Sequence, residues 1–363
     1  MRILYGCMLF MLSIQSYAAP SSEALSELLQ RHLDESGLVG LGAAVVSGDH
    51  DAVIAVAGER KIGTGDLLAV TDRWHIGSVT KSVTATLAAR LVDQGHLSWQ
   101  TTLADIITAE QEFHSGWRDV TLKQLLNHTA GAPANFSLLV HAKHPDTLAD
   151  IRRARETAVL QRLQHAPKTP PGEVFAYSNV GYTIAGYMLE QVMDQPWESL
   201  IQTQVYDPLA LHSAGFGAPP SGLPRGHYRF LGFTRAASAD FDNTPIIGPA
   251  GTSHMTLADL ARYAHEHLNG ALGKGVLASA EQYQVLHTPD LSGYAGGWVI
   301  NAESDVGLGT AVWHNGSNRR WYTLLVLFPE VNVAIAITAN DGRIGLAEGT
   351  AWRLVREIAP FVR

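Results

Sequence analysis

Two residues that can act together as a nucleophile and its base stand in the stretch WHIGSVTKSVTATLAARLV, residues 74–92. Ser78 and Lys81 are three positions apart where a helical pattern begins, and on a helix this spacing places the lysine amine beside the serine hydroxyl. A serine hydroxyl needs a base to become nucleophilic, and burial lowers the pKa of a lysine toward the range where the neutral amine serves. The competing interpretation is that Ser78 only caps the helix and that Lys81 is a solvated residue of its first turn.

The helix that carries this pair is predicted to be buried. Val83, Leu87 and Leu91 recur at intervals of four and form one apolar face, and Gly95 ends the pattern. The start of such a helix leaves backbone N–H groups unpaired, where they can stabilise negative charge that develops on a carbonyl oxygen. A buried helix start is therefore a suitable place for acyl-transfer chemistry.

Two distant segments supply partners for Ser78 and Lys81. Tyr177-Ser178-Asn179 lies at a loop-to-helix junction in PPGEVFAYSNVGYTIAGYMLE, and His314-Asn315-Gly316-Ser317 lies on a predicted strand in AVWHNGSNRRWYTLLVLF. The order SxxK, YxN and HxG resembles the penicillin-recognising serine hydrolases, which include class C β-lactamases, D-alanyl-D-alanine peptidases and related esterases. The segments LLNHTAG and GPAGTSHMTLADLARY are also similar to that family, and the resemblance covers essentially the whole mature chain.

The resemblance implies acyl transfer on Ser78. This serine would attack the carbonyl carbon of an amide or ester, while Lys81 and Tyr177 form the base system that removes its proton. Which of the two holds that proton stays open, because a coupled pair need not have a single owner. Water would then release the acyl group with Tyr177 as its activating base. The implied substrate is a β-lactam or a D-alanyl-type peptide, with a small ester as the close competitor, and no cofactor or metal is implied.

The resemblance also assigns residues that bind the substrate. Asn179 is expected to hydrogen-bond the substrate's amide side chain, and His314 to lie beside the substrate. The backbone N–H groups of Ser78 and Ser317 would form the oxyanion hole. Gly316 would let the strand backbone approach the substrate closely.

His314 departs from the class C pattern, in which lysine usually occupies this position. A histidine offers positive charge only below about pH 6.5, or not at all if it is desolvated. Asn315 also replaces the usual threonine or serine hydroxyl. Three arginines could supply the missing positive charge: Arg319, Arg320 and Arg343. It fits their positions better, however, that they are solvated residues at the ends of strands. The departure favours a peptidase or esterase substrate over a dedicated antibiotic-resistance enzyme.

The pattern of elements predicts an α/β fold. Strand signals occur at both ends of the chain around a mainly helical middle, so an antiparallel sheet flanked by helices should carry an inserted helical domain. We assign residues 20–105 and 285–363 to the α/β domain and residues 106–284 to the helical domain. The family fold places its active site in the cleft between two such domains, and loops 132–150 and 212–245 should shape substrate choice.

The N-terminus is typical of an export signal. Arg2 precedes about a dozen mostly apolar residues and then the small residues of QSYAAP, so residues 1–19 are predicted to be a signal peptide. The run is too short for a stable membrane span. Cys7 is the only cysteine, which excludes a disulfide, and a lipidation site at Cys7 fits poorly because the apolar run continues beyond it. The predicted location is the periplasm or the exterior.

Other functional classes find little support. A net charge of −8 at pH 7 gives no footprint for nucleic acid or for anionic lipid. No G-x-S-x-G or H-E-x-x-H motif occurs, and the sixteen histidines lack metal-ligand spacing. His128 in NHTAG is expected to be a buried, hydrogen-bonded residue. A penicillin-binding sensor without turnover remains the alternative from another class, and the oligomeric state is left open.

Overall fold

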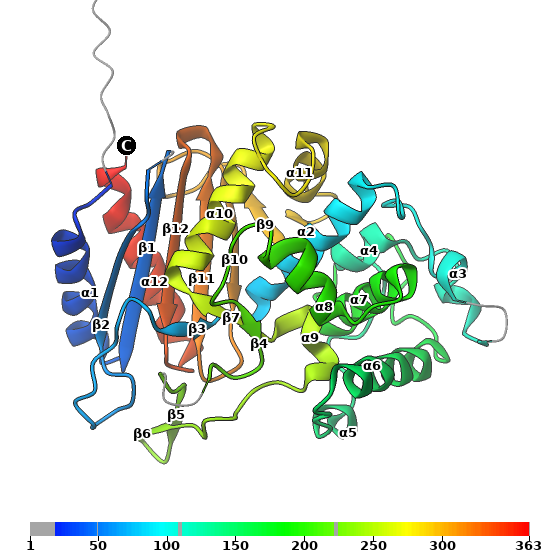
Figure 1. The fold of residues 1–363 in the computed structure, drawn as a ribbon, viewed down its shortest axis with the longest axis horizontal. Helices are drawn as coiled ribbons and strands as arrows, with labels where there is room; N and C mark the ends of the chain where they lie inside the picture. Colours follow the sequence, from blue (N-terminus) through cyan, green and yellow to red (C-terminus); the bar gives the residue numbers. More distant parts are fainter. Residues whose placement is uncertain (1–18, 49, 108–110, 221–223, 363) are drawn as a thin grey trace, which may run out of the picture.

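A seven-stranded antiparallel sheet forms the centre of the computed structural model, which describes residues 19–48, 50–107, 111–220 and 224–362. Its strand order is β2-β1-β12-β11-β10-β9-β8. The N-terminal hairpin therefore pairs with the last strand of the chain, as Figure 1 shows. The strands are β1 (Gly40–Ser47), β2 (Val53–Gly58), β8 (Tyr294–Ala295), β9 (Trp298–Asn301), β10 (Ala311–Gly316), β11 (Tyr322–Phe328) and β12 (Val333–Ala339).

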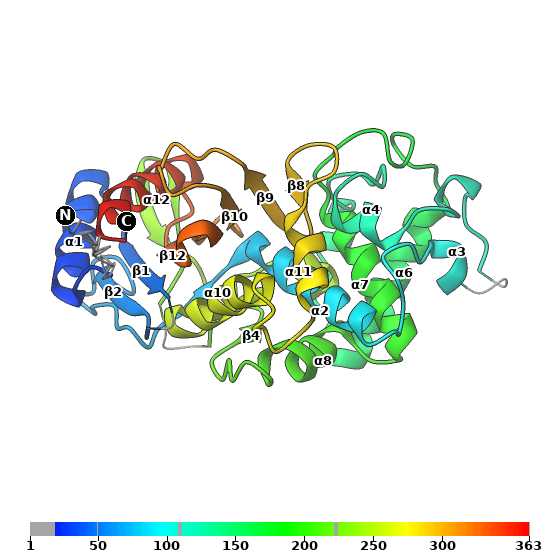
Figure 2. The same cartoon turned by 90° about the horizontal axis from the view of Figure 1, so that it is seen from above.

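Both faces of the sheet are covered, which explains why β1 is an almost unbroken apolar run. Leu41 and Val45 belong to one core, and Ala44 and Val46, on the opposite face, belong to the other. Helices pack on the two faces, two on the first and one on the second (Figures 1 and 2): α1 (Ser22–Ser36), α12 (Ile344–Ile358) and α10 (Leu257–Ala271). The sheet is thereby the middle layer of three.

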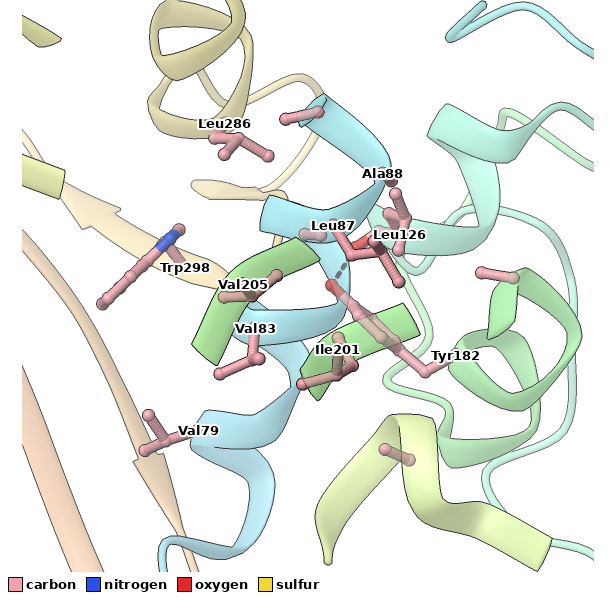
Figure 3. Packing of buried hydrophobic residues seen from close by; sticks show 14 of the residues in the cluster. Val79, Val83, Leu87, Ala88, Leu126, Tyr182, Ile201, Val205, Leu286 and Trp298 are labelled. Atoms are coloured by element: carbon pink, nitrogen blue, oxygen red, sulfur yellow. Dashed lines mark hydrogen bonds between the residues drawn. The ribbon is translucent and has the colours of Figure 1, made fainter. Parts of the chain in front are cut away.

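Helix α2 (Thr80–Asp93) lies between the sheet and the remaining helices and begins directly after the 3-10 turn η1 (Gly77–Val79). Val83, Leu87 and Leu91 are fully buried, which confirms the predicted apolar face, and Figure 3 shows the first two among side chains from neighbouring helices. The other helices are α3 (Leu103–Ile106), α4 (Leu122–Leu126), α5 (Leu138–His141), α6 (Leu148–Leu163), α7 (Asn179–Met193), α8 (Trp197–Ile201), α9 (Gly248–Gly251) and α11 (Ala280–His287).

A buried ion cluster joins three of these helices. Arg155 of α6 contacts the carboxylates of Glu190 in α7 and Glu198 in α8, and the Arg155 and Glu190 side chains are fully buried. Buried charges of this kind are tolerated only when they are paired and hydrogen-bonded. The cluster fixes the helical region that carries Asn179.

The predicted α/β fold, with an antiparallel sheet flanked by helices, is confirmed. The chain also holds short strands that the sequence pattern did not predict, because pieces of two to four residues carry no periodicity of their own. They are β3 (Arg73–His75), β4 (Gly215–Phe216), β7 (Ser253–Thr256) and the hairpin β5 (His227–Phe230) with β6 (Phe233–Ala236). Strands β3, β7 and β4 form a small sheet beside the start of α2.

The division into 20–105 with 285–363 and 106–284 stays a prediction, and α10, which lies within 106–284, packs on the central sheet. Residues 1–18, which hold Cys7 and nearly all of the predicted signal peptide, lie outside the described residues. Among the helices that the structure does describe, none has the length and apolar character needed to cross a bilayer.

Candidate active site

The 3-10 turn η1 presents Ser78 at the start of α2. Gly77 has φ +52°, a conformation that suits glycine, and its N–H donates to Nδ1 of His75 at 3.1 Å. The hydroxyl of Thr80 donates to the Gly77 carbonyl at 2.7 Å. The turn is therefore held from both sides, and Ser78 remains only partly buried while its neighbours are buried.

Lys81 is fully buried and its amine lies against Ser78. The Lys81 Nζ atom lies 3.2 Å from Ser78 Oγ, 2.7 Å from Asn179 Oδ1 and 2.8 Å from the Ala250 carbonyl oxygen. Desolvation by burial lowers its pKa well below 10.5. Two of these partners only accept hydrogen bonds, so a neutral amine keeps two N–H groups on them and turns its lone pair toward the Ser78 hydroxyl. The solvated-lysine interpretation is thus excluded.

The orientation of the Asn179 side chain is fixed by a second asparagine. Asn179 Nδ2 donates to Asn135 Oδ1 at 2.7 Å, which leaves Asn179 Oδ1 facing the lysine. Asn135 lies in loop 132–150, and its role was missed because a lone asparagine in a loop has no recognisable pattern. The same holds for the Ala250 carbonyl, whose position follows only from the fold.

Tyr177 is the second side chain that contacts the Ser78 hydroxyl. Its ring is stacked near the amine, with Lys81 Nζ 4.7 Å from the ring centroid. Desolvation raises the pKa of Tyr177 to about 12, and a hydrogen bond to Ser78 opposes this rise. The residue as a whole is 38% exposed, so one part of the ring faces the cleft while the hydroxyl is desolvated. Tyr177 is therefore a neutral phenol at physiological pH.

His128 positions the segment that carries Tyr177. Its Nδ1 atom accepts a hydrogen bond from the N–H of Ser178 at 3.1 Å, and its carbonyl accepts one from the N–H of Ala176 at 2.8 Å. The centroid of its ring lies 4.4 Å from the centroid of the Tyr177 ring. Burial, and then the nearby Lys81, lower the pKa of His128 well below 6.5. As expected, this histidine is buried and hydrogen-bonded.

Two glycines bring the strand β10 against η1. A Cβ atom on Gly316 would lie 2.4 Å from the Ser78 backbone nitrogen, and a Cβ atom on Gly77 would lie 2.2 Å from the Ser317 backbone nitrogen. Any larger residue at either position would therefore force the two segments apart. This contact places the backbone nitrogens of Ser78 and Ser317 close together, as an oxyanion hole requires.

His314 is buried beside this contact and carries no charge. Its Nδ1 lies within hydrogen-bond distance of the Asn315 carbonyl, which only accepts, so Nε2 accepts from the Tyr294 hydroxyl at 3.1 Å. Burial, followed by repulsion from Lys81, lowers the pKa of His314 to about 3. Both ring nitrogens are thus committed within the protein, and the site has no cation at this position.

The remaining polar side chains considered from the sequence near β10 each have a different set of neighbours. Asn315 turns its amide toward Glu348 of α12, at 3.1 Å. Arg343 pairs with Asp341, and the Arg320 guanidinium lies over the rings of Tyr228 and Phe241. Of the three arginines considered from the sequence, only Arg319 lines a cavity that also contains Ser78.

Two cavities meet at Ser78. One, of about 340 Å³, is bounded by Tyr177, His314 and the strand β10. The other, of about 460 Å³, is bounded by Asn179, Ser317 and Arg319, and it shares Phe241 and Asn243 with a third cavity of about 730 Å³. Loops 132–150 and 212–245 contribute to the lining of the second and third cavities. Within the described part of the chain, no group of three or more acidic, histidine or cysteine side chains is arranged to hold a metal ion.

Two named proteins are similar in sequence to this chain over most of its length. Penicillin-binding protein 4 of Amycolatopsis lactamdurans is 29% identical over an alignment of 330 residues, which covers 83% of this chain and 81% of that protein. The unguisins hydrolase ungD' of Aspergillus campestris is 24% identical over 92% of this chain, and the match spans 64% of that longer relative.

Solved structures share the fold. The D-amino acid amidase from Ochrobactrum anthropi, in complex with D-phenylalanine, superposes with a TM-score of 0.77 at 16% identity and covers 94% of this chain and 98% of its own. SurE superposes with a TM-score of 0.75 at 23% identity and covers 93% and 76%. The family model described as Beta-lactamase matches residues 25–359. The chain therefore belongs to the Beta-lactamase family and is a serine hydrolase.

Proposed function

We propose that the protein is an exported hydrolase that forms an acyl-enzyme on Ser78 and cleaves amide bonds next to D-amino acids. The observation that carries this proposal is the arrangement of Lys81, whose desolvated amine is held by two acceptors and directed at Ser78 Oγ. Relatives named as a penicillin-binding protein and a D-amino acid amidase support the substrate class. The roles of the individual residues and the class of substrate belong to this proposal.

Acylation begins with the neutral amine of Lys81. It takes the hydroxyl proton of Ser78 as Oγ bonds to the carbonyl carbon of the substrate, and the carbonyl oxygen becomes negatively charged. The backbone N–H groups of Ser78 and Ser317 stabilise that oxygen. A fixed pair of donors is suited to this role because it needs no rearrangement during the reaction.

Tyr177 is suited to act as the acid. With a pKa of about 12 it holds its proton, which passes to the departing nitrogen as the carbon–nitrogen bond breaks, and the proton on Lys81 restores the phenol. In the second half, a water gives one proton to the Lys81–Tyr177 pair and its hydroxyl to the acyl carbon. Ser78 then recovers that proton and the acid product leaves.

The uncharged His314 favours substrates without a terminal carboxylate. A β-lactam or a carboxypeptidase substrate presents such a group to the third motif, where this protein offers a neutral imidazole. Arg319 is the cleft arginine that remains, and it is exposed. A D-amino acid amide or an internal D-peptide bond is therefore preferred over a β-lactam, and a carboxylic ester is the second candidate on the same observation.

The cavities support an extended substrate. The cavity beside Ser78 shares the lining residues Phe241 and Asn243 with a second cavity of about 730 Å³, and the two together exceed the needs of a small ester. The convergence of Ser78, Lys81 and Tyr177 argues for turnover, because a sensor that only binds has no use for a base system. Export, with cleavage near residue 19, remains a prediction from the sequence alone.

A panel of substrates tests this proposal. D-phenylalanine amide, L-phenylalanine amide, a D-alanyl-D-alanine peptide, a chromogenic cephalosporin and a p-nitrophenyl ester are compared by kcat/KM, with Ser78→Ala as the control. We expect the D-amide to exceed its L-isomer and the cephalosporin at least tenfold, and Ser78→Ala to lose activity while its melting temperature is unchanged. Faster cephalosporin hydrolysis would contradict the substrate class, and equal rates in Ser78→Ala would contradict the mechanism.

A further inference from the structure

The hairpin formed by β5 and β6 projects from the lower edge of the molecule in Figure 1. Leu231 and Gly232 form its two-residue turn, with φ of +47° and +84°. Turns of this kind favour asparagine or glycine at the first position, and leucine adopts the left-handed conformation unfavourably. A large apolar side chain thus stands at a tip where folding alone favours a small polar residue.

The tip is apolar and exposed. Phe230, Leu231 and Phe233 are 53%, 80% and 68% exposed, and the pairing of Phe230 with Phe233 puts both rings on one face of the hairpin. Single exposed apolar residues are ordinary, but three together on a projection mark an interaction surface. Helix α5 lies at the same edge in Figure 1 and exposes Leu138 and Leu139, of which Leu138 lines the Ser78 cavity.

Two arginines flank the apolar tip. Arg229 and Arg235 are exposed on the two strands behind it, and residues 227–236 contain no aspartate or glutamate. At the base of the hairpin the Arg320 guanidinium lies 4.3 Å from the centre of the Tyr228 ring. The net charge of −8 for the whole chain, which argued against anionic lipid, hides this local basic region.

We propose that the β5–β6 hairpin docks the protein on a bilayer that contains anionic phospholipid. Phe230, Leu231 and Phe233 enter the interfacial region, where apolar side chains are stabilised, and Arg229 and Arg235 contact lipid phosphates. Complementary charge selects anionic lipid over the same hairpin of a second copy, which is equally basic. Docking at this edge brings the cleft beside α5 to the membrane surface.

Vesicle binding tests the proposal with protein whose N-terminus is mapped by mass spectrometry to lie after the apolar run 3–14. We expect wild-type protein to sediment with vesicles of phosphatidylglycerol and phosphatidylcholine, and at least tenfold less with phosphatidylcholine alone. The double variant Leu231→Ser/Phe233→Ser should lose at least tenfold in bound fraction. Leu272→Ser, which removes a leucine that is 59% exposed at the end of α10, should bind as wild type does.

Further variants separate the contributions. Arg229→Ser/Arg235→Ser should weaken vesicle binding and make it less dependent on salt concentration. Each substitution removes one electrostatic contact between an arginine and a lipid phosphate. Melting temperature and far-UV circular dichroism should match wild type in every variant. Absence of sedimentation with anionic vesicles, or equal sedimentation of the tip variant, would overturn the proposal. Self-association in solution that depends on the tip, without vesicle binding, would also overturn it and assign the hairpin to a second copy. None of these readouts depends on catalysis.

Discussion

The amine of Lys81 lies 3.2 Å from the hydroxyl oxygen of Ser78, and the lysine is fully buried. Its remaining partners are the Asn179 amide oxygen and the Ala250 carbonyl, and desolvation is the cause that lowers its pKa. A lysine in these surroundings favours the neutral form that a general base requires. The chemistry proposed for the site depends on this contact.

Lys81→Met should lower kcat/KM by about 10³-fold, within the usual range for a general base. Its melting temperature should equal or exceed that of wild type, because methionine removes a buried amine that is costly to desolvate. Hydrolysis of the preferred amide and thermal unfolding are the two measurements. Lys123→Met, at a lysine that pairs with Asp290 near the surface, serves as the matched control and should change neither quantity. Activity within tenfold of wild type in Lys81→Met would rule out Lys81 as the base.

The pH dependence of kcat/KM should show a wide plateau. Activity rises as Lys81 loses its proton, at a pH below 10.5 because burial lowers the lysine pKa. It falls only when Tyr177 ionises, at about pH 12. The profile is measured up to pH 11 with a stable amide substrate. A decline that begins between pH 8 and 9 would show that the acid is a different group.

Stability should depend on pH through the same lysine. Burial lowers the pKa of Lys81 in the folded state, whereas the unfolded state keeps the ordinary lysine pKa of about 10.4. At pH values between these two pKa values the folded state binds fewer protons than the unfolded state. The free energy of unfolding therefore increases with pH in that range. The stability advantage of Lys81→Met over wild type should therefore shrink as pH rises toward 10. Urea unfolding of both proteins at pH 6, 8 and 10 measures this difference. A gap that widens with pH would have the wrong sign.

His314 should not titrate between pH 5 and 8, because burial and Lys81 lower its pKa to about 3. His314→Gln should keep the shape of the pH profile in this range, and kcat/KM should fall less than tenfold. Parallel profiles of wild type and variant, taken in one mixed buffer, provide the comparison. An inflection near pH 6.5 that the variant loses would show that the imidazole becomes charged in the working enzyme.

Gly316→Ala should reduce kcat/KM at least 10²-fold, since the new Cβ would lie 2.4 Å from the Ser78 nitrogen and would displace the proposed oxyanion hole. The matched control is Gly349→Ala in α12, where nothing lies within 4 Å of the new Cβ. That control should retain full activity and gain about 1 kcal/mol in stability from improved helix propensity. Full activity in Gly316→Ala would show that the strand has room to move.

The sequence was sufficient for the parts of the site that carry local patterns. The spacing of Ser78 and Lys81, the apolar face of α2 and the apolar run of β1 all follow from short-range rules, and the structure shows the corresponding elements. The order of motifs then allowed Tyr177 to be joined to the pair, although the three segments are far apart in the chain. The structure brings all three side chains together.

The parts that the sequence left open depend on tertiary contacts. The pKa of His314 is lowered by burial and then by the nearby Lys81, and neither the burial nor this neighbour can be read from sequence spacing. Asn135, which accepts a hydrogen bond from the Asn179 side chain, lies in a loop whose sequence has no recognisable motif. The basic character of the β5–β6 hairpin was not predicted either, because the net charge of the whole chain conceals a basic region of ten residues.

Mass spectrometry of the trapped acyl-enzyme is the most direct test of the central claim. The protein is quenched in acid during turnover of an activated acyl donor, digested, and the peptide containing Ser78 is weighed. We predict that this peptide gains the mass of one acyl group in wild type, that the acyl form accumulates faster than in Lys81→Met, and that Ser78→Ala gains none. An acyl group on another residue, or turnover with the same rate in Ser78→Ala, would contradict the account.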